Sequence, residues 1–211
     1  MRHNRLILEL NRRIAESLPY AGTVLDLGCG QSPYRAEILS RADRYYGVDW
    51  PQSLHDLKDV DVLASIGLPL PFRDASADTV VAFQVMEHLP DPAGFLHECR
   101  RVLRTDGRLF LTVPFMWGVH EAPHDYYRFT RHGLEHLLAR AGFGSVEVRE
   151  NTGFWQTWVL KFNYHTQRWL SGRLGLLLAP LWWLGQRVAP ALDRWDPHPE
   201  ETASYTVIAS H

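Results

Sequence analysis

The chain has 211 residues, a formal net charge of -2 at neutral pH, 45% hydrophobic residues and 22% charged residues. These values are typical of a single globular domain, and they offer no electrostatic basis for binding nucleic acid. The two cysteines are too few for a disulfide framework, which predicts reduced thiols in a cytoplasmic protein. Because the N-terminus is charged and no run of about 18 apolar residues occurs, we expect neither a signal segment nor a simple transmembrane helix.

The predicted elements alternate between helices and strands. A first helix over 5–18 places Leu6, Leu10, Ile14 and Leu18 on one face, and Pro19 ends it. Strands are expected at 23–27, 45–49, 59–63, 78–83, 108–113, 145–149 and 204–209, and further helices at 34–40, 92–103 and 130–141. This order predicts an α/β fold with a doubly wound, mostly parallel sheet covered on both faces.

A glycine turn follows the first predicted strand, in the sequence Val24–Gly30. Gly28 and Gly30 permit a tight turn and close approach of the backbone to a ligand. We expect Ser32 to cap the next helix and Pro33 to occupy its first position. The third glycine of the dinucleotide-binding pattern is missing, which disfavours an NAD-dependent oxidoreductase.

An acidic residue ends the second predicted strand. Asp49 lies 21 positions after Gly28, a spacing that suits a carboxylate accepting hydrogen bonds from ribose hydroxyls. Ligands of such sheets bind at the carboxyl ends of the strands. We place five residues at those ends: Gly28, Gly30, Asp49, Asp61 and Gln84.

Six blocks of the sequence together resemble, in order, those of the class I S-adenosylmethionine-dependent methyltransferases. The blocks are Val24–Gly30, Tyr45–Asp49, Leu70–Asp74, Val85–Leu89, Arg101–Gly107 and Ala141–Phe143. The resemblance covers about residues 20–150, with Ser204–Ala209 as the expected last strand. It implies a Rossmann-like sheet of seven strands, the last one antiparallel, and an enzyme that uses S-adenosyl-L-methionine and releases S-adenosyl-L-homocysteine.

The resemblance also implies cofactor contacts for particular residues. Gly28 and Gly30 would wrap the methionine part, and Asp49 would hold the ribose. Asp61 is the best match for the acid that meets the adenine amino group, and Gln84 and Val85 would flank the sulfonium. Asp26 would bind either amides of the loop or the amino group of the cofactor.

The acceptor side is predicted from the polar and aromatic run Pro114–Thr130, which follows the fifth strand. His120, His124 and Asp125 are the candidates for a general base, and a histidine is favoured because its pKa lies near neutrality. The candidate acceptor-binding residues are His88, Trp117, Tyr126, Tyr127 and Arg128. The alternative is a structural ion pair of Asp125 with Arg128 and packing of Tyr127. The run is similar to one found in a branch of the family that acts on sugar, glycan or lipid-linked acceptors.

Residues 120–124 also fit the zinc-protease pattern H-E-x-x-H. That motif requires both imidazoles on one face of a continuous helix, and Pro123 disfavours such a helix. We therefore predict no metal site, with an accessory divalent ion held by His120, His124 and Asp125 as the alternative.

A tryptophan-rich insertion occupies residues 151–202, before the last strand. Trp155, Trp158, Phe162, His165 and Trp169 recur at helical spacing, and Leu174–Leu184 is almost entirely apolar around Pro180. Three roles remain open for it: packing on the core or as a lid, a homodimer face, or peripheral membrane contact through 155–190.

These observations predict one domain over 1–211. It comprises an N-terminal helix at 1–19, a cofactor-binding core at 20–150, the helical insertion at 151–202 and the last strand at 203–210. The predicted function is methyl transfer to a small-molecule, glycan or lipid-linked acceptor, at oxygen, with a histidine base. The alternative is a non-catalytic module of the same fold that binds the cofactor or a partner.

Overall fold

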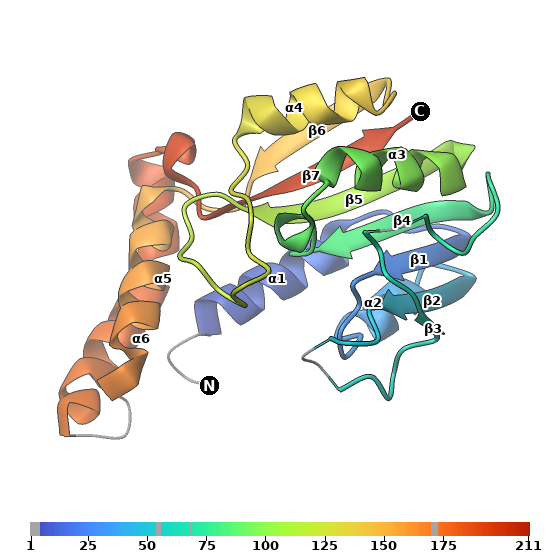
Figure 1. Ribbon diagram of the computed structural model, residues 1–211. Coiled ribbons are helices and arrows are strands. Elements are labelled where there is room, and N and C mark those ends of the chain that lie inside the picture. Colours follow the sequence, from blue (N-terminus) through green and yellow to red (C-terminus); the bar gives the residue numbers. More distant parts are fainter. Residues whose placement is uncertain (1–4, 54–55, 68, 170–172) are drawn as a thin grey trace.

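The computed structural model describes residues 5–53, 56–67, 69–169 and 173–211 (Figure 1). Its centre is a seven-stranded sheet of order β3-β2-β1-β4-β5-β7-β6. The strands are β1 (Thr23–Leu27), β2 (Arg44–Asp49), β3 (Val62–Leu63), β4 (Ala77–Phe83), β5 (Leu103–Pro114), β6 (Ser145–Glu150) and β7 (Ser204–Ser210). All pairings from β3 to β5 are parallel, and β7 is antiparallel to both of its neighbours. The predicted fold class is therefore confirmed.

Alternating side chains on the strands build two apolar layers. Val80 and Ala82 of β4 belong to the larger core, whereas Val81 points into the smaller one. Helices α3 (Pro92–Val102) and α4 (Arg131–Arg140) cover the first face, and α1 (Arg5–Ser17) and α2 (Arg35–Leu39) cover the second (Figure 1). A sheet covered in this way buries its strands on both faces, which explains why their sequences are nearly continuous apolar runs.

Side-chain caps fix the starts of the two helices on the larger core. Asp91 accepts a hydrogen bond from the amide of Gly94 at the start of α3, at 2.9 Å. Thr130 accepts one from the amide of Gly133 at the start of α4, at 3.1 Å, as the sequence predicts. Each cap satisfies an amide that has no partner within its own helix.

Several predicted boundaries are wrong. α2 begins at Arg35, and Ser32 does not cap it; Ser32 has φ of 50° and its hydroxyl donates to the carbonyl of Asp59. β3 contains only Val62–Leu63, so Asp61 precedes that strand rather than following it. β5 begins at Leu103, five residues early, because Leu103 pairs with Ala77 before a register shift in the ladder.

The insertion forms an arm beside the carboxyl ends of β4 and β5 (Figure 1). It consists of α5 (Phe154–Thr166), the short helix η3 (Gln167–Trp169) and α6 (Arg173–Trp195), which continues through two prolines. Asp193 of α6 accepts hydrogen bonds from three amides at the start of α5. The indole of Trp182 donates to Thr166 at 2.8 Å. These polar contacts hold the two helices against each other.

The aromatic face of α5 is turned outward. The buried residues of α5 are Thr157, Leu160, Asn163 and Thr166, on the opposite face of the helix. Trp158, Phe162 and Trp169 are exposed instead. The arm therefore presents these three rings to the surroundings, which argues against packing of this face on the core of the domain.

Within the part of the chain that the structure describes, no helix combines the length and apolar character needed to cross a bilayer. The prediction on 1–19 includes residues 1–4, and that on 151–202 includes 170–172; these residues lie outside the described ranges.

Candidate functional site

A pocket of about 380 Å³ opens where the chain leaves β1 and β4. The glycine turn forms its floor, and Gly28 and Gly30 have φ of 74° and 53°. Val85 packs so closely against Gly28 that a Cβ there would lie 2.5 Å from a methyl group of Val85. This crowding and the positive φ explain why glycine occupies position 28.

Asp49 holds the glycine turn to the end of β2. Its Oδ2 accepts a hydrogen bond from the amide of Gly30 at 2.6 Å, and its Oδ1 accepts one from the amide of Trp50 at 2.6 Å. A carboxylate has about four acceptor positions, so each oxygen retains one for a further donor. The buried Asp49 therefore both shapes the turn and remains chemically able to accept ribose hydroxyls.

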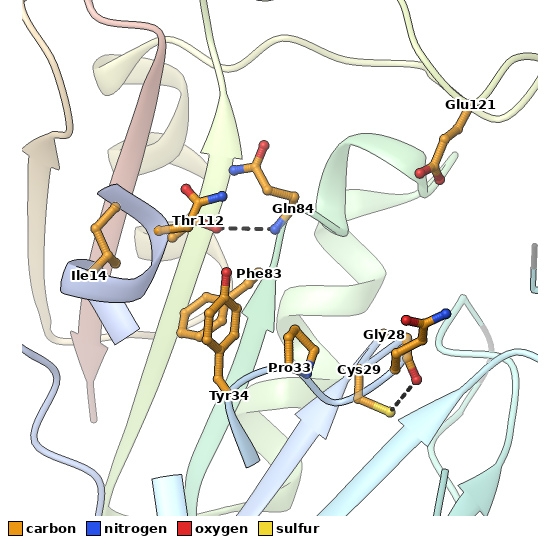
Figure 2. A pocket seen from close by; sticks show the side chains of 12 residues that line it. Ile14, Gly28, Cys29, Pro33, Tyr34, Phe83, Gln84, Thr112 and Glu121 are labelled. Carbon is orange, nitrogen blue, oxygen red and sulfur yellow. Dashed lines mark hydrogen bonds between the residues drawn. The ribbon is translucent and has the colours of Figure 1, made fainter. Parts of the chain in front are cut away.

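Phe83 and Gln84 form the wall of the pocket at the end of β4, and Val85 lies behind Gly28 without lining the pocket. Gln84 has φ of 56°, and its backbone N–H donates to the carbonyl of Thr112 on the neighbouring strand, at 2.9 Å. Figure 2 shows Ile14 of α1 and Glu121 of the loop after β5 on opposite sides of the hollow. The sequence reasoning missed the wall formed by Asn11 and Ile14, because a helix pattern does not tell which strand ends the helix crosses.

Two predicted cofactor ligands lie elsewhere. The carboxylate of Asp26 accepts the hydroxyl of Tyr45 at 2.7 Å, and burial raises the pKa of Asp26 to about 6. Asp61 accepts the amide of Gly47 at 2.8 Å and both terminal nitrogens of Arg35 at 3.2 Å. Neither residue lines the pocket, and neither does Asp49, so the lining does not separate the three aspartates. The side-chain contacts of Asp26 and Asp61 with Tyr45 and Arg35 nevertheless favour structural roles over contacts with the amino group or the adenine.

The loop of residues 115–130 is tied to β4 and to itself. The amides of Tyr126 and Tyr127 donate to the carbonyl of Glu87, the first at 2.9 Å. Arg128 forms a two-pronged ion pair with Asp125 and also donates to the carbonyls of Trp117 and Gly118. The guanidinium of Arg128 holds the pKa of Asp125 well below its usual range, which makes Asp125 a poor proton acceptor. This is the structural pair that the sequence left as an alternative.

The predicted aromatic acceptor residues are spread over the loop. Tyr126 and Tyr127 are exposed, and the hydroxyl of Tyr127 donates to the carbonyl of Pro90 at 3.1 Å. Trp117 packs against Tyr164 of α5, with ring centroids 5.4 Å apart. The rings thus connect the loop to both the segment before α3 and the arm. Residues 120–124 form a turn rather than a helix, as Pro123 predicts, so the zinc-protease geometry is absent from this loop.

The three histidines have different surroundings. The imidazoles of His88 and His120 meet edge to face, with centroids 4.9 Å apart. The ring of His124 lies against Trp50 at 5.7 Å, and its Nδ1 lies 3.3 Å from the hydroxyl of Tyr126. His88 and His124 are also joined, because Nδ1 of His88 lies 2.5 Å from the carbonyl oxygen of His124.

Glu87 is the functional candidate that the sequence reasoning missed. It lies in the short helix η2 (Met86–His88) directly after β4, with no exposed surface. Neither carboxylate oxygen has a hydrogen-bond partner among the described residues. Burial raises the pKa of Glu87 to about 8. The sequence could have indicated Glu87 through its position after the fourth strand, within the block Val85–Leu89.

The sheet order and the glycine turn are those of the Rossmann-like fold of class I methyltransferases. The comparisons with known proteins agree with this fold class. Residues 25–111 match the sequence model of a methyltransferase domain family. A solved SAM-dependent methyltransferase from Archaeoglobus fulgidus aligns with a TM-score of 0.62 at 16% identity, covering 98% of this chain and 94% of that one. Another from Mesorhizobium loti gives 0.60 at 16% identity, covering 95% and 96%.

Curated relatives resemble parts of the chain. Over 100 residues, or 44% of this chain, the sequence is 39% identical to a Mycobacterium tuberculosis protein named "Probable S-adenosylmethionine-dependent methyltransferase". That match spans 36% of the relative's own length. The ubiquinone biosynthesis O-methyltransferase of Pseudomonas paraeruginosa is 26% identical over 139 residues, covering 61% of this chain and 57% of that protein. Residues 25–111 thus match a methyltransferase domain family, and the solved neighbours share the fold of the chain.

The raised pKa of Asp26 gives a prediction for stability. A folded pKa of about 6, against about 3.9 in an unfolded chain, means that the native state binds this proton more tightly. The resulting stabilisation is complete below about pH 4 and is lost as the pH rises through about 6. Between pH 4 and pH 7 we expect the wild type to lose about 2–3 kcal/mol relative to Asp26→Asn.

Chemical unfolding of both proteins at the two pH values measures this difference. Asp43→Asn, at an exposed aspartate just before β2, controls for the loss of one carboxylate. A difference between wild type and Asp26→Asn that stays constant with pH would contradict the burial of an ionisable Asp26.

Proposed function

We propose that this chain binds S-adenosyl-L-methionine and transfers its methyl group to a hydroxyl oxygen of a small-molecule, glycan or lipid-linked acceptor. The observation that carries the proposal is the glycine turn, held by the buried carboxylate of Asp49 at the floor of a pocket of about 380 Å³. This volume lies in the range of sites for small ligands, roughly 300–1,000 Å³. The methyltransferase domain match over 25–111 supports the same cofactor.

The bound cofactor would supply a methyl group already activated by a positive sulfur. The carbon–sulfur bond breaks as the carbon–oxygen bond forms, and S-adenosyl-L-homocysteine leaves as a neutral thioether. The protein therefore has two tasks, namely to align the acceptor oxygen and to accept its proton. Gln84, which lines the pocket after β4, suits the alignment at the sulfonium, and the loop of residues 115–130 suits the acceptor.

His124 is the proton acceptor that the contacts favour. The carboxylate of Asp125 is already paired with Arg128. Both ring nitrogens of His120 lie beside protein groups, Nδ1 beside the carbonyl of Gly118 and Nε2 beside the carboxylate of Glu87. The exposed imidazole of His124 contacts only the hydroxyl of Tyr126 and the ring of Trp50 among the described residues, so it has room to approach an acceptor. An imidazole has a pKa suited to this step near neutrality.

Asp49→Ala tests the cofactor site. Loss of the carboxylate removes ribose hydrogen bonds and the hold on Gly30, so we expect S-adenosyl-L-homocysteine to bind about 1–3 kcal/mol more weakly. Isothermal titration measures this change. Asp59→Asn is the matched control, because exposed Asp59 offers its carbonyl, not its carboxylate, to Ser32 and Arg35. An unchanged dissociation constant for Asp49→Ala would refute the assignment.

His124→Ala tests the acceptor side. We expect turnover to fall by about 10²–10⁴-fold while the affinity for S-adenosyl-L-homocysteine stays unchanged, because the side chain serves the acceptor and not the cofactor. Release of S-adenosyl-L-homocysteine is measured with a panel of phenolic, sugar and lipid-linked hydroxyl compounds. His132→Ala, at an exposed histidine on α4, is the control. If the wild type binds the cofactor but turns over no member of the panel, the non-catalytic module is favoured.

We further propose that the arm contacts an anionic membrane surface and brings a lipid-linked acceptor to the site. Three exposed tryptophans of the arm each carry a cation over the ring: Lys161 over Trp158, Arg168 over Trp169 and Arg187 over Trp183. Exposed Leu181 and Leu184 lie on the same arm. Tryptophan and basic residues beside apolar side chains are typical of helices that lie in the membrane interface.

A second hollow supports the same partner. It measures about 430 Å³ between α1 and α6, and four arginines line it: Arg5, Arg13, Arg187 and Arg194. Glu9 also lines it and forms an ion pair with Arg5, so the hollow has an excess of three positive charges. Guanidinium groups bind phosphate oxygens through paired hydrogen bonds, so this hollow suits the phosphate of a lipid headgroup.

Trp158→Ala combined with Trp183→Ala tests the membrane contact. We expect the double variant to sediment with anionic phospholipid vesicles about tenfold less than the wild type, because two interfacial anchors are lost. Trp195→Ala is the matched control, since exposed Trp195 has no cation over its ring among the described residues. Equal sedimentation of all three proteins would contradict the proposal, and a concentration-dependent mass in solution that the double variant abolishes would favour the homodimer face.

A further inference from the structure

Three potential metal ligands converge beside the pocket. Oε1 of Glu87 lies 3.8 Å from Nε2 of His88 and 3.9 Å from Nε2 of His120. One ligand atom from each of these residues falls within 4.8 Å of the other two. The carboxylate of Glu87 is fully buried and aimed between the imidazoles, and it has no hydrogen-bond partner among the described residues.

The other nitrogen of each imidazole is directed at a backbone carbonyl. Nδ1 of His88 lies 2.5 Å from the carbonyl oxygen of His124. Nδ1 of His120 lies 3.2 Å from the carbonyl oxygen of Gly118 and 3.3 Å from a terminal nitrogen of Arg128, and the carbonyl is the partner that accepts a proton from the ring. An imidazole that donates its proton through Nδ1 keeps the lone pair on Nε2. Metal-binding histidines are commonly fixed in this way, by a backbone or carboxylate acceptor behind the ring. Both free lone pairs then face Glu87.

Direct hydrogen bonds do not explain the cluster. The two nitrogen–oxygen distances of 3.8 and 3.9 Å exceed the range of about 2.7–3.2 Å for such bonds. Both are shorter than the sum of two zinc–ligand bonds of about 2.0–2.2 Å each, so one ion can reach both atoms of a pair at an angle wider than tetrahedral. Two imidazoles and one carboxylate are the donor set of zinc sites with an open position and of non-haem iron sites.

We propose that Glu87, His88 and His120 bind one divalent transition-metal ion and leave a coordination position open toward the pocket. Glu121 indicates this direction, because it lines the pocket and its Oε2 lies 3.8 Å from Nε2 of His88. The site differs from the ion alternative weighed from the sequence, which combined His120 with His124 and Asp125. In the structure Asp125 is paired with Arg128, and His124 supplies its carbonyl.

The binding of the ion is independent of the proposed function, whereas its role in the reaction rests on it. An ion at this position would coordinate the acceptor oxygen and lower the pKa of its hydroxyl. The released proton would pass to His124, whose backbone is already joined to His88. An acceptor with a hydroxyl beside a second oxygen suits such an ion best, since both oxygens can bind it.

Metal binding is measured on the full-length, untagged protein after chelator treatment and desalting. Isothermal titration with Zn²⁺ gives stoichiometry and affinity, and titration with Co²⁺ reports the ligands through its visible absorption bands. The variants are Glu87→Gln, which keeps the shape of the side chain, and His120→Ala. The controls are His124→Ala, which separates the two possible ligand sets, and His132→Ala, which breaks an exposed histidine–glutamate pair on α4.

We expect one ion per chain in the wild type and in both controls, and binding weakened by about a hundredfold or more in Glu87→Gln and His120→Ala. Zn²⁺ should also raise the midpoint of thermal unfolding of the wild type but not of His120→Ala, which tests the site even where Glu87→Gln fails to fold. The proposal is overturned if the wild type binds no ion, or if His120→Ala binds Zn²⁺ as the wild type does. Titration of the same samples with S-adenosyl-L-homocysteine shows separately whether the cofactor site holds.

Discussion

The site depends on one carboxylate that joins two neighbouring strands at their ends. Asp49 is the last residue of β2, and its carboxylate accepts hydrogen bonds from the backbone amides of Gly30 and Trp50, each at 2.6 Å. Because the carboxylate is charged and buried, these hydrogen bonds are stronger than those between neutral groups, by about a factor of two. They hold the turn open where a longer side chain would collapse into it. The positive φ of Gly28 and the close packing of Val85 complete the same turn.

A second buried carboxylate has the opposite character. The carboxylate of Glu87 makes no hydrogen bond among the described residues, its imidazole neighbours lying 3.8 and 3.9 Å away. Burying a polar group without a hydrogen bond costs about 1–3 kcal/mol or more. Its backbone carbonyl nevertheless anchors Tyr126 and Tyr127, so the position is required to place the loop. Glutamine would satisfy that backbone role equally well. The carboxyl group itself therefore indicates a chemical role, and the two facing imidazoles suggest that this role is metal binding.

The sequence predicts the order and type of the elements because these follow from local patterns. The apolar strands and the glycine turn are visible in a few residues each. The prediction that Ser32 caps the next helix failed because its hydroxyl donates to the backbone carbonyl of Asp59, a contact across 27 positions of the chain. Asp61 was placed wrongly because β3 is only two residues long, and its length depends on pairing with β2 rather than on its own composition. The facing of Glu87, His88 and His120 likewise arises from contacts between β4 and a distant loop.

The arm shows the same limit in reverse. Helical spacing correctly places Trp158, Phe162 and Trp169 on one face, yet it does not tell which face the protein buries. The polar contacts decide this, because Asp193 draws the start of α5 toward α6 and Thr166 holds the indole of Trp182. With its polar face used for these contacts, α5 turns its rings away from the domain. An outward aromatic face beside the carboxyl ends of β4 and β5 places any apolar partner of the arm next to the acceptor loop, and Trp117 on Tyr164 is the direct contact between the two.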